Sequence, residues 1–455
     1  MSDTIVALAT PPGEAALAVM RISGSLVRSI IEGALIEKDR SPTLAPRLTR
    51  LSHYRNLSGK TLDHLVWVYY AGPKSFTGED MLELISHGSP FIVQRLLEDL
   101  EQRGARQAEP GEFTKTAFVN GKMDLAQAEA VVDVIRARSE QSLKIAQQQL
   151  AGALGKHVSN LVERLLRVTA HLEAYIDFPD EDLPAEDVSG PVAELSDFQN
   201  AIDQLMATEQ YRNRLQDGIS VVLVGAPNAG KSSLLNRLVA DDRAIVSEEA
   251  GTTRDFIEVR GTLGGHLVRY FDTAGLRDSG SKIEEAGMAK SLEMAKKADL
   301  ILHIIDAQED HIALDANTLK DFEKKALIRV LNKADLVDEA SSVMDVSPSS
   351  VDIIRVSALT GDGLYDLQKA LIRYLDTDFK VPEDADVAVS ARHSAALAEV
   401  KSKVSEALGK LRAGSSIELA ATDLHLAIEA IGRIVGRIDS EQMLDELFGS
   451  FCIGK

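Results

Sequence analysis

The stretch that most constrains the fold is GAPNAGKS, at residues 225–232. It matches the phosphate-binding pattern G-x-x-x-x-G-K-S and stands between the apolar run ISVVLV and the amphipathic run KSSLLNRLV. Gly225 and Gly230 let the backbone curl until its N–H groups face phosphate oxygens at a helix N-terminus. Lys231 can then reach the terminal phosphates, and Ser232 can hold Mg²⁺. Strand, loop and helix together predict an α/β nucleotide-binding domain.

The region around this loop, residues 217–378, alternates short apolar runs with helix-length amphipathic segments. The apolar runs are ISVVLV, LVRYF, LILHIID, LIRVL and DIIRV. This alternation predicts a parallel, doubly wound sheet, as in a Ras-like α/β P-loop domain.

Three further motifs follow strands in the order expected of a GTPase: DTAG, NKAD and SAL, of which SAL, at 357–359, fits the loop that closes on guanine. DTAG at 272–275 offers Asp272 to a metal through water and Gly275 to the γ-phosphate. In NKAD, at 332–335, Asp335 can accept both N–H groups of the edge of guanine, which adenine does not offer. We expect these residues to contact GTP: Asn228, Ala229, Gly230, Lys231, Ser232, Ser233, Thr252, Thr253, Asp272, Gly275, Asn332, Lys333, Asp335, Ser357 and Ala358.

The segment GTTRD, at 251–255, lies between the phosphate loop and DTAG. One of its threonines is expected to coordinate Mg²⁺ and sense the γ-phosphate, and we favour Thr253. The alternative is a polar turn without a role in binding.

Hydrolysis poses a problem, because Leu276 follows DTAG and an aliphatic side chain cannot orient the attacking water. The phosphate loop contains no arginine, whereas Asn228 offers a neutral carbonyl oxygen of the kind that coordinates a monovalent cation. A cation held there could do the electrostatic work of an arginine finger. Glu284 and Glu285 are candidates for positioning the water, although the residues alone favour a solvated helix face for both.

Composition limits the functions that the chain can have. A formal charge of −20 argues against a broad nucleic-acid surface, so that any RNA contact must be local or assisted by a partner. The single cysteine, Cys452, excludes an intramolecular disulfide and a cysteine-cluster zinc site. With no apolar run of about 18 to 20 residues, we expect a soluble cytoplasmic protein.

A length of 455 residues requires several domains. Residues 1–119 mix strand and helix patterns and predict an α+β domain. Residues 120–216 and 379–455 are helical, and we expect them to form one all-α domain into which 217–378 is inserted. Helical spacing from Leu125 to Leu150 predicts one long amphipathic helix.

The whole chain resembles the MnmE (TrmE) family of tRNA-modification GTPases. Besides GTTRD and DTAGLR, the segments that carry the resemblance are TIVALATPPG at 4–13, SFTGEDMLEL at 75–84, PGEFTKTAFVNGKMDLAQAEAV at 110–131 and FCIGK at 451–455. The resemblance implies a homodimer formed through the N-terminal domain. It also implies an MnmG-type flavoprotein partner in a heterotetramer, and K⁺-activated GTP hydrolysis when G domains pair. The implied reaction adds an aminomethyl-type group to C5 of the wobble uridine of tRNA.

The resemblance also implies roles for particular residues. Glu284 matches a catalytic glutamate that acts through water, and the implied K⁺ ligands are Asn228, Ser247, Glu249 and Thr252. A tetrahydrofolate donor, as the 5-formyl or 5,10-methylene derivative, would be bound by Arg21, Glu83 and Lys122. Cys452 matches a terminal cysteine, which is either a nucleophile or an inert apolar residue.

Two positions depart from the family pattern, since Thr116 stands where an arginine is expected and SHGSP at 86–90 replaces a glycine-richer segment. The alternative function is a regulatory, Era-like GTPase acting on RNA or the ribosome. Such a chain would end in a basic module, whereas residues 381–455 carry eight Lys and Arg against twelve Asp and Glu. The acidic tail favours the modification enzyme.

Overall fold

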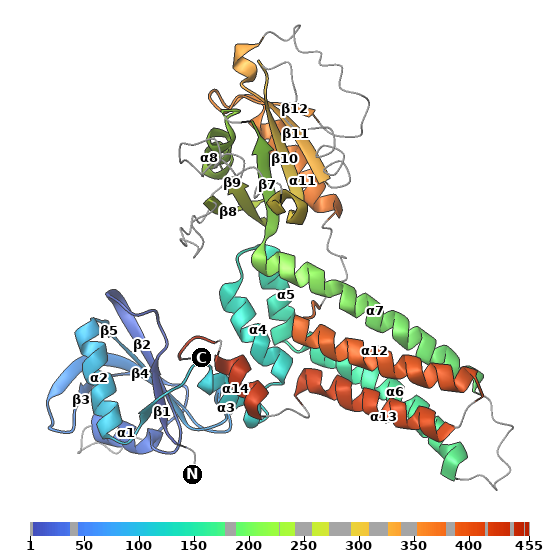
Figure 1. The fold of residues 1–455 in the computed structure, drawn as a ribbon. Helices are drawn as coiled ribbons and strands as arrows, with labels where there is room; N and C mark the ends of the chain where they lie inside the picture. Colours follow the sequence, from blue (N-terminus) through green and yellow to red (C-terminus); the bar gives the residue numbers. More distant parts are fainter. Residues whose placement is uncertain are drawn as a thin grey trace. The chain divides into compact units, whose positions relative to one another are not determined.

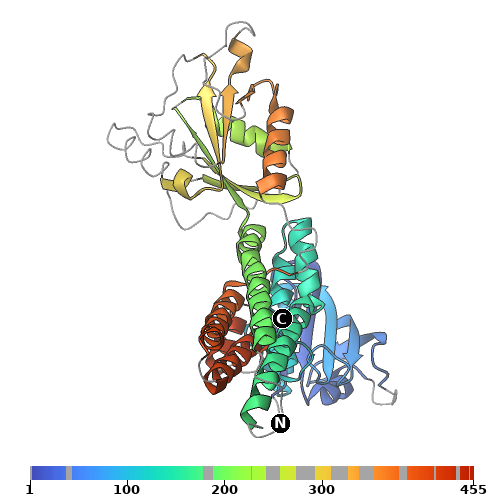
Figure 2. The same ribbon diagram turned by 90° about the vertical axis from the view of Figure 1, so that its right-hand side faces the viewer.

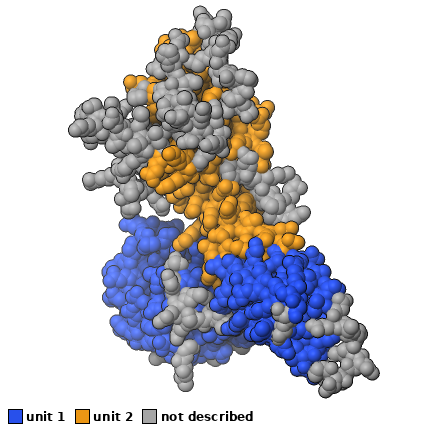
Figure 3. Space-filling view, turned by 45° about the vertical axis from the view of Figure 1, so that its right-hand side comes forward, with its two compact units in different colours: residues 1–132, 149–199, 395–455 blue, residues 133–148, 200–394 orange. Residues whose placement is uncertain are grey.

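The structure is a computed structural model of the chain (Figures 1 and 2). It describes residues 3–36, 44–177, 188–226, 228–241, 257–272, 293–308, 326–337, 353–378, 387–414, 417–436, 441–449 and 451–454. Contacts divide the chain into two compact units (Figure 3). Unit 1 comprises residues 1–132, 149–199 and 395–455, and unit 2 comprises residues 133–148 and 200–394. Within the described ranges no helix is long and apolar enough to cross a membrane.

The N-terminal part of unit 1 is a six-stranded sheet of order β3-β4-β5-β2-β1-β6. Its strands are β1 (Ile5–Leu8), β2 (Ala15–Ser23), β3 (Thr49–Arg55), β4 (Thr61–Tyr70), β5 (Met81–Gly88) and β6 (Arg106–Gln107). Helices α1 (Val27–Ala34) and α2 (Pro90–Gln102) share a core with alternate strand residues such as Met20, Trp67 and Leu84. The α+β prediction is confirmed, because alternation along each strand leaves one apolar face for the helices.

The helical part of unit 1 is assembled from distant stretches of sequence. It contains α3 (Glu112–Val119), α6 (Ala153–Asp177), α12 (Ala391–Arg412), α13 (Ile417–Gly432) and α14 (Glu441–Gly449). Figure 1 shows α6 and α13 side by side, and they make the most extensive helix–helix contact among the described elements. The last described residues return to the start of the helical region, where Phe448 and Phe451 pack with Leu125.

The single long helix predicted from Leu125 to Leu150 is wrong. The structure has α4 (Leu125–Arg136) and α5 (Glu140–Leu150), separated by a short break. Ser139 causes the break: its hydroxyl accepts a hydrogen bond from the backbone N–H of Ser142 at 3.1 Å, while the Ser142 hydroxyl accepts one from the Ser139 N–H at 3.0 Å. Such reciprocal capping starts a new helix. The long helix α7 (Ser189–Asp217) then leads to the second sheet.

Unit 2 contains a six-stranded sheet of order β12-β11-β10-β7-β9-β8. Its strands are β7 (Ile219–Gly225), β8 (Ile257–Leu263), β9 (His266–Asp272), β10 (Leu300–Asp306), β11 (Ala326–Asn332) and β12 (Ile353–Arg355). Helices α8 (Lys231–Asp241) and α11 (Leu364–Asp378) pack into one core on the same face (Figure 2). Except for β8, every described pairing in this sheet is parallel, as predicted.

Strand β8 departs from the all-parallel prediction, because it pairs with β9 in an antiparallel hairpin. The turn is Gly264–Gly265, with φ of 59° and 87°. Two adjacent glycines with positive φ form the tight turn that matches the twist of a hairpin. The Gly-Gly pair between two apolar runs was the sequence signal for this strand.

Candidate functional site

The phosphate loop lies between β7 and α8, and two of its glycines leave no space for a side chain. A Cβ on Gly225 would lie 2.1 Å from the carbonyl oxygen of Ile304, in the neighbouring strand. A Cβ on Gly230, where φ is 89°, would lie 2.2 Å from Nδ2 of Asn332. The sharp curl of the loop thus depends on glycine at both positions. It ends at the N-terminus of α8, where backbone N–H groups are available for phosphate oxygens.

Lys231 holds this loop in its curled conformation. Its ammonium group donates hydrogen bonds to the carbonyl oxygens of Gly225 at 2.9 Å and Ala226 at 2.8 Å. Burial lowers the pKa of the Lys231 ammonium, and the nearby Asp272 carboxylate opposes that shift. An incoming phosphate would give the ammonium a charged partner in place of two carbonyl dipoles, so the site gains electrostatic energy when an anion binds.

Ser232 and Asp272 form the metal side of the site. The Ser232 hydroxyl donates a hydrogen bond to Oδ2 of Asp272 at 2.5 Å, and Asp272 is almost completely buried at the end of β9. A hydroxyl and a carboxylate are both hard oxygen ligands, and Mg²⁺ in nucleotide sites takes few protein ligands beside water and phosphate. The pair therefore fits Mg²⁺, as the sequence predicted for Ser232.

Asn332 connects the base side of the site to the phosphate loop. Its Nδ2 donates to the carbonyl oxygen of Ala229 at 2.8 Å, and its Oδ1 accepts from the backbone N–H of Ala358 at 3.1 Å. Ser357 donates to Oδ1 of Asp335 at 2.6 Å, which orients a carboxylate that is otherwise exposed. Hydrogen bonds thus connect the phosphate loop, NKAD and SAL.

Asp306 is a site residue that sequence reasoning missed. It ends β10, and its Oδ2 lies 2.6 Å from the ammonium of Lys333. Lys333 has a φ of 62°, and this ion pair fixes the position of its side chain. The missed signal was an acidic residue at the carboxyl end of a buried strand, where ligands of parallel sheets bind.

The N-terminal sheet brings two of the predicted folate residues together. Nη2 of Arg21 lies 2.9 Å from Oε1 of Glu83, on neighbouring strands β2 and β5, and both side chains are mostly buried. Tyr70, which the sequence did not single out, donates to the other oxygen, Oε2, at 3.2 Å. The Arg21 guanidinium also lies over the ring of Phe76, at 5.5 Å from its centre. Glu83 is thereby held in one orientation, with lone pairs left for a ligand.

Lys122 and Cys452 lie close to this part of the sheet. The Lys122 ammonium donates to the carbonyl oxygen of Pro73 at 2.8 Å, in the loop between β4 and β5. The C-terminal peptide runs along the N-terminal part: Arg21 donates to the carbonyl oxygen of Gly454 at 3.4 Å, and the carbonyl of Cys452 accepts from the N–H of Gly111 at 3.4 Å. Cys452 itself is exposed.

Several predicted residues lie outside the described residues. They are Glu284, Ser247, Glu249, Thr252, Thr253 and Gly275. Their roles remain predictions from the sequence.

Two family models together span almost the whole chain. One described as the GTP-binding protein TrmE N-terminus matches residues 4–122, and one described as the MnmE helical domain matches residues 125–452. Among solved structures, the G domain of the T. maritima FeoB iron transporter matches 34% of this chain and 98% of its own, at 23% identity and a TM-score of 0.25.

Curated proteins named tRNA modification GTPase MnmE match over the full length. The protein of Opitutus terrae is 48% identical, over 100% of this chain and 99% of its own. Those of Aquifex aeolicus and Thermotoga maritima are 39% and 37% identical, each over 100% of both chains.

Proposed function

Because this chain belongs to the family of the MnmE tRNA modification GTPases, we propose that it is the GTP-hydrolysing subunit of a tRNA wobble-uridine modification enzyme. Its product would carry a carboxymethylaminomethyl or aminomethyl group at C5, with a tetrahydrofolate derivative as the one-carbon donor. The observation that carries the GTPase part is the hydrogen-bonded link from Ala229 through Asn332 to Ala358, which joins the phosphate loop to the guanine-reading motifs.

Hydrolysis would proceed without the glutamine that is absent after DTAG. Lys231 and the backbone N–H groups at the start of α8 bind the phosphates, while Ser232 and Thr253 would hold Mg²⁺ beside Asp272. Asn228, with Ser247, Glu249 and Thr252, would hold a K⁺ ion, which supplies positive charge as an arginine finger does. The exposure of Asn228 in the phosphate loop, where its φ is 65°, supports this role, because a cation can reach it.

Glu284 would orient the attacking water. Replacement of Glu284 by Ala is expected to leave GTP affinity nearly intact while cutting turnover about 10²-fold, which corresponds to roughly 2.7 kcal/mol of transition-state stabilisation. Glu285→Ala is the matched control and should be nearly silent. Parental turnover in Glu284→Ala would exclude this role.

The folate site would be built around Glu83. A pterin ring presents N–H groups that a carboxylate can accept, and the hydrogen bonds from Arg21 and Tyr70 hold Glu83 ready for them. The position of Lys122, against the loop between β4 and β5, suits the acidic end of the folate. Cys452 lies on the peptide that contacts Arg21 through Gly454, where it would be either a nucleophile or an inert apolar residue.

The assembly would be a cytoplasmic homodimer that works with an MnmG-type flavoprotein as a heterotetramer on tRNA. The acidic charge of −20 suits an enzyme that meets tRNA with a partner. It does not suit an Era-like regulatory GTPase with its own basic RNA-binding module.

A reconstituted reaction tests the whole proposal. The purified chain, an MnmG-type flavoprotein, unmodified tRNA, GTP, Mg²⁺, K⁺ and a methylene-tetrahydrofolate donor are incubated with ammonium or with glycine as the source of the amine nitrogen. The nucleosides are then analysed by mass spectrometry. We expect a C5-modified wobble uridine only when both proteins and the folate are present. GTP hydrolysis without any change of the tRNA would favour the regulatory alternative.

A further inference from the structure

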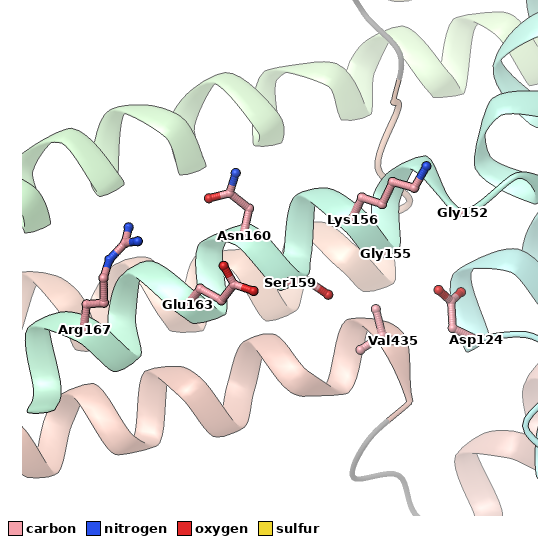
Figure 4. Close-up of a pocket in the computed structure, with 9 residues that line it drawn as sticks. All are labelled: Asp124, Gly152, Gly155, Lys156, Ser159, Asn160, Glu163, Arg167 and Val435. Atoms are coloured by element: carbon pink, nitrogen blue, oxygen red, sulfur yellow. The ribbon is translucent and has the colours of Figure 1, made fainter.

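A polar groove in unit 1 lies beside the N-terminal half of α6 (Figure 4). It has a volume of about 750 Å³, and a second hollow of about 510 Å³ adjoins it, because Asp124 and Val435 line both. Gly152 and Gly155 contribute to the wall of the first hollow, and Gly121 and Gly436 to the wall of the second. No side chain projects into either hollow from these four glycines.

Three cations follow one another along this groove: Lys122 in the smaller hollow, then Lys156 and Arg167 on α6. Figure 4 shows Lys156 and Arg167 at the two ends of the row of labelled residues on α6, and both are exposed. Their separation of eleven residues places them roughly 16 Å apart along the helix. Among the described residues, neither of these two α6 side chains makes an ion pair or hydrogen bond with the protein. Spaced cations of this kind are suited to an extended ligand with several negative charges.

The groove begins next to the proposed folate site. The stem of Lys122 lies against Gly78, where an added Cβ would be 3.3 Å from Lys122 Cδ, and its ammonium group binds the carbonyl of Pro73. Phe76, in the same loop, lies beneath the Arg21 guanidinium that pairs with Glu83. The loop between β4 and β5 therefore separates Glu83, the carboxylate proposed to bind the pterin, from Lys122, the first of the three cations.

We propose that this groove binds the γ-linked glutamate tail of a polyglutamylated folate, an assignment that rests on the folate site proposed above. Each added γ-glutamate leaves one free α-carboxylate, so the tail is a flexible chain with evenly spaced negative charges. Lys122 takes the first carboxylate, and Lys156 and Arg167 take the later ones. A tRNA backbone fits less well, because specific phosphate binding requires more cations than this groove offers.

Two carboxylates also line the groove, those of Asp124 and Glu163. The Asp124 carboxylate caps the start of α4, where its Oδ1 accepts a hydrogen bond from the backbone N–H of Gln127 at 2.7 Å. Glu163 lies between the two α6 cations and is exposed. Its charge opposes an acidic tail, so its removal is expected to strengthen binding, whereas removal of Lys156 or Arg167 weakens it.

Calorimetry on the full-length protein tests this assignment with two probes, 5-formyl-tetrahydrofolate as the monoglutamate and as the triglutamate. An exposed ion pair contributes about 1 kcal/mol at most, and the triglutamate can form two more of them than the monoglutamate. We therefore expect the triglutamate to bind about tenfold more tightly. The double variant Lys156→Ala/Arg167→Ala should lose most of that gain and keep the monoglutamate affinity. Glu163→Gln should enlarge the gain about threefold. Lys144→Ala, an exposed cation on α5 outside the groove, is the control and should change neither affinity.

The outcomes distinguish failure of the groove as the site of the glutamate tail, called here the tail site, from failure of the proposed folate site. Equal affinity of the parental protein for both probes, or an unchanged gain in the double variant, overturns the tail site while the folate site stands. If neither probe binds a sample that still binds GTP, the folate site is refuted, and the tail site with it.

Discussion

The side-chain amide of Asn332 lies 2.8 Å from the carbonyl oxygen of Ala229, so the last residue of β11 holds the phosphate loop that follows β7. The same side chain accepts a hydrogen bond from the backbone N–H of Ala358. Gly230 leaves space for the Asn332 side chain because it has no Cβ. One buried side chain therefore connects the phosphate loop to the segment that the sequence predicts to bind the base.

Replacement of Asn332 by Leu, which has a similar volume, removes both hydrogen bonds and leaves buried backbone groups without partners. We expect a loss of about 2 kcal/mol in binding, or roughly thirtyfold, for GTP and GDP alike. Titration with fluorescent nucleotides measures the change. Asn200→Leu, at an exposed position of α7, is the control, and an Asn332→Leu protein with parental affinity would contradict the linking role.

Asp335→Asn is expected to weaken GTP binding and improve binding of xanthine nucleotides. The carboxylate accepts two N–H groups of guanine, whereas an amide offers xanthine a donor for the carbonyl that replaces the exocyclic amine. The hydrogen bond that Ser357 now donates to Asp335 should keep the substituted side chain in place, since an amide oxygen can accept it as well. Competition binding with GTP and XTP gives the ratio of affinities, and an unchanged ratio would show that NKAD does not read the base.

K⁺ is expected to stimulate GTP hydrolysis strongly, and Na⁺ much less. The phosphate loop contains Asn228 and no arginine, so an ion of the right radius must supply the positive charge. Turnover is measured in matched chloride salts. In Asn228→Ala the difference between the salts should disappear, and equal turnover of the parental protein in both salts would refute the K⁺ site.

His303 should make unit 2 less stable in mild acid. It is buried in β10 opposite Arg329, and burial, with a smaller contribution from the Arg329 charge, lowers its pKa from 6.5 to about 4. Below pH 6.5 the unfolded chain takes up a proton that the folded protein refuses until about pH 4. Stability is therefore complete above pH 6.5 and falls by roughly 3 kcal/mol as the pH approaches 4.

Thermal unfolding between pH 4 and pH 7 tests this dependence. His303→Leu should flatten the pH dependence of the transition that reports on unit 2. The control His157→Gln, on the exposed face of α6, should leave it unchanged. A parental slope in His303→Leu would assign the acid sensitivity to other groups.

The curled loop between β7 and α8 could be predicted from the sequence because its shape depends on a local motif. Gly225 begins this loop and Lys231 begins α8 directly after it, and strand ends of a parallel sheet meet at one edge. The antiparallel β8 was missed because alternating strands and helices were taken as a parallel pattern throughout, although Gly264–Gly265 marks the hairpin.

Contacts between distant residues were harder to predict. Nothing in the sequence near Glu83 shows that Tyr70 will bind its second oxygen, because that contact depends on the register of β4 and β5. The break between α4 and α5 was missed for another reason: helical spacing continues across it, while the capping by Ser139 and Ser142 interrupts the backbone. The spacing of apolar residues shows which face of a helix is buried. It does not show where side chains replace the backbone hydrogen bonds of the helix, as Ser139 and Ser142 do here.

The most direct test of the account measures C5-modified wobble uridine in tRNA from a strain that lacks this gene. The strain is complemented with the parental protein or with Lys231→Ala, at matched protein levels confirmed by immunoblot. Since Lys231 is the cation expected to meet the phosphates of GTP, the parental protein should restore the modification and Lys231→Ala should leave the tRNA unmodified. Full restoration by Lys231→Ala would contradict the claim that this nucleotide site drives tRNA modification.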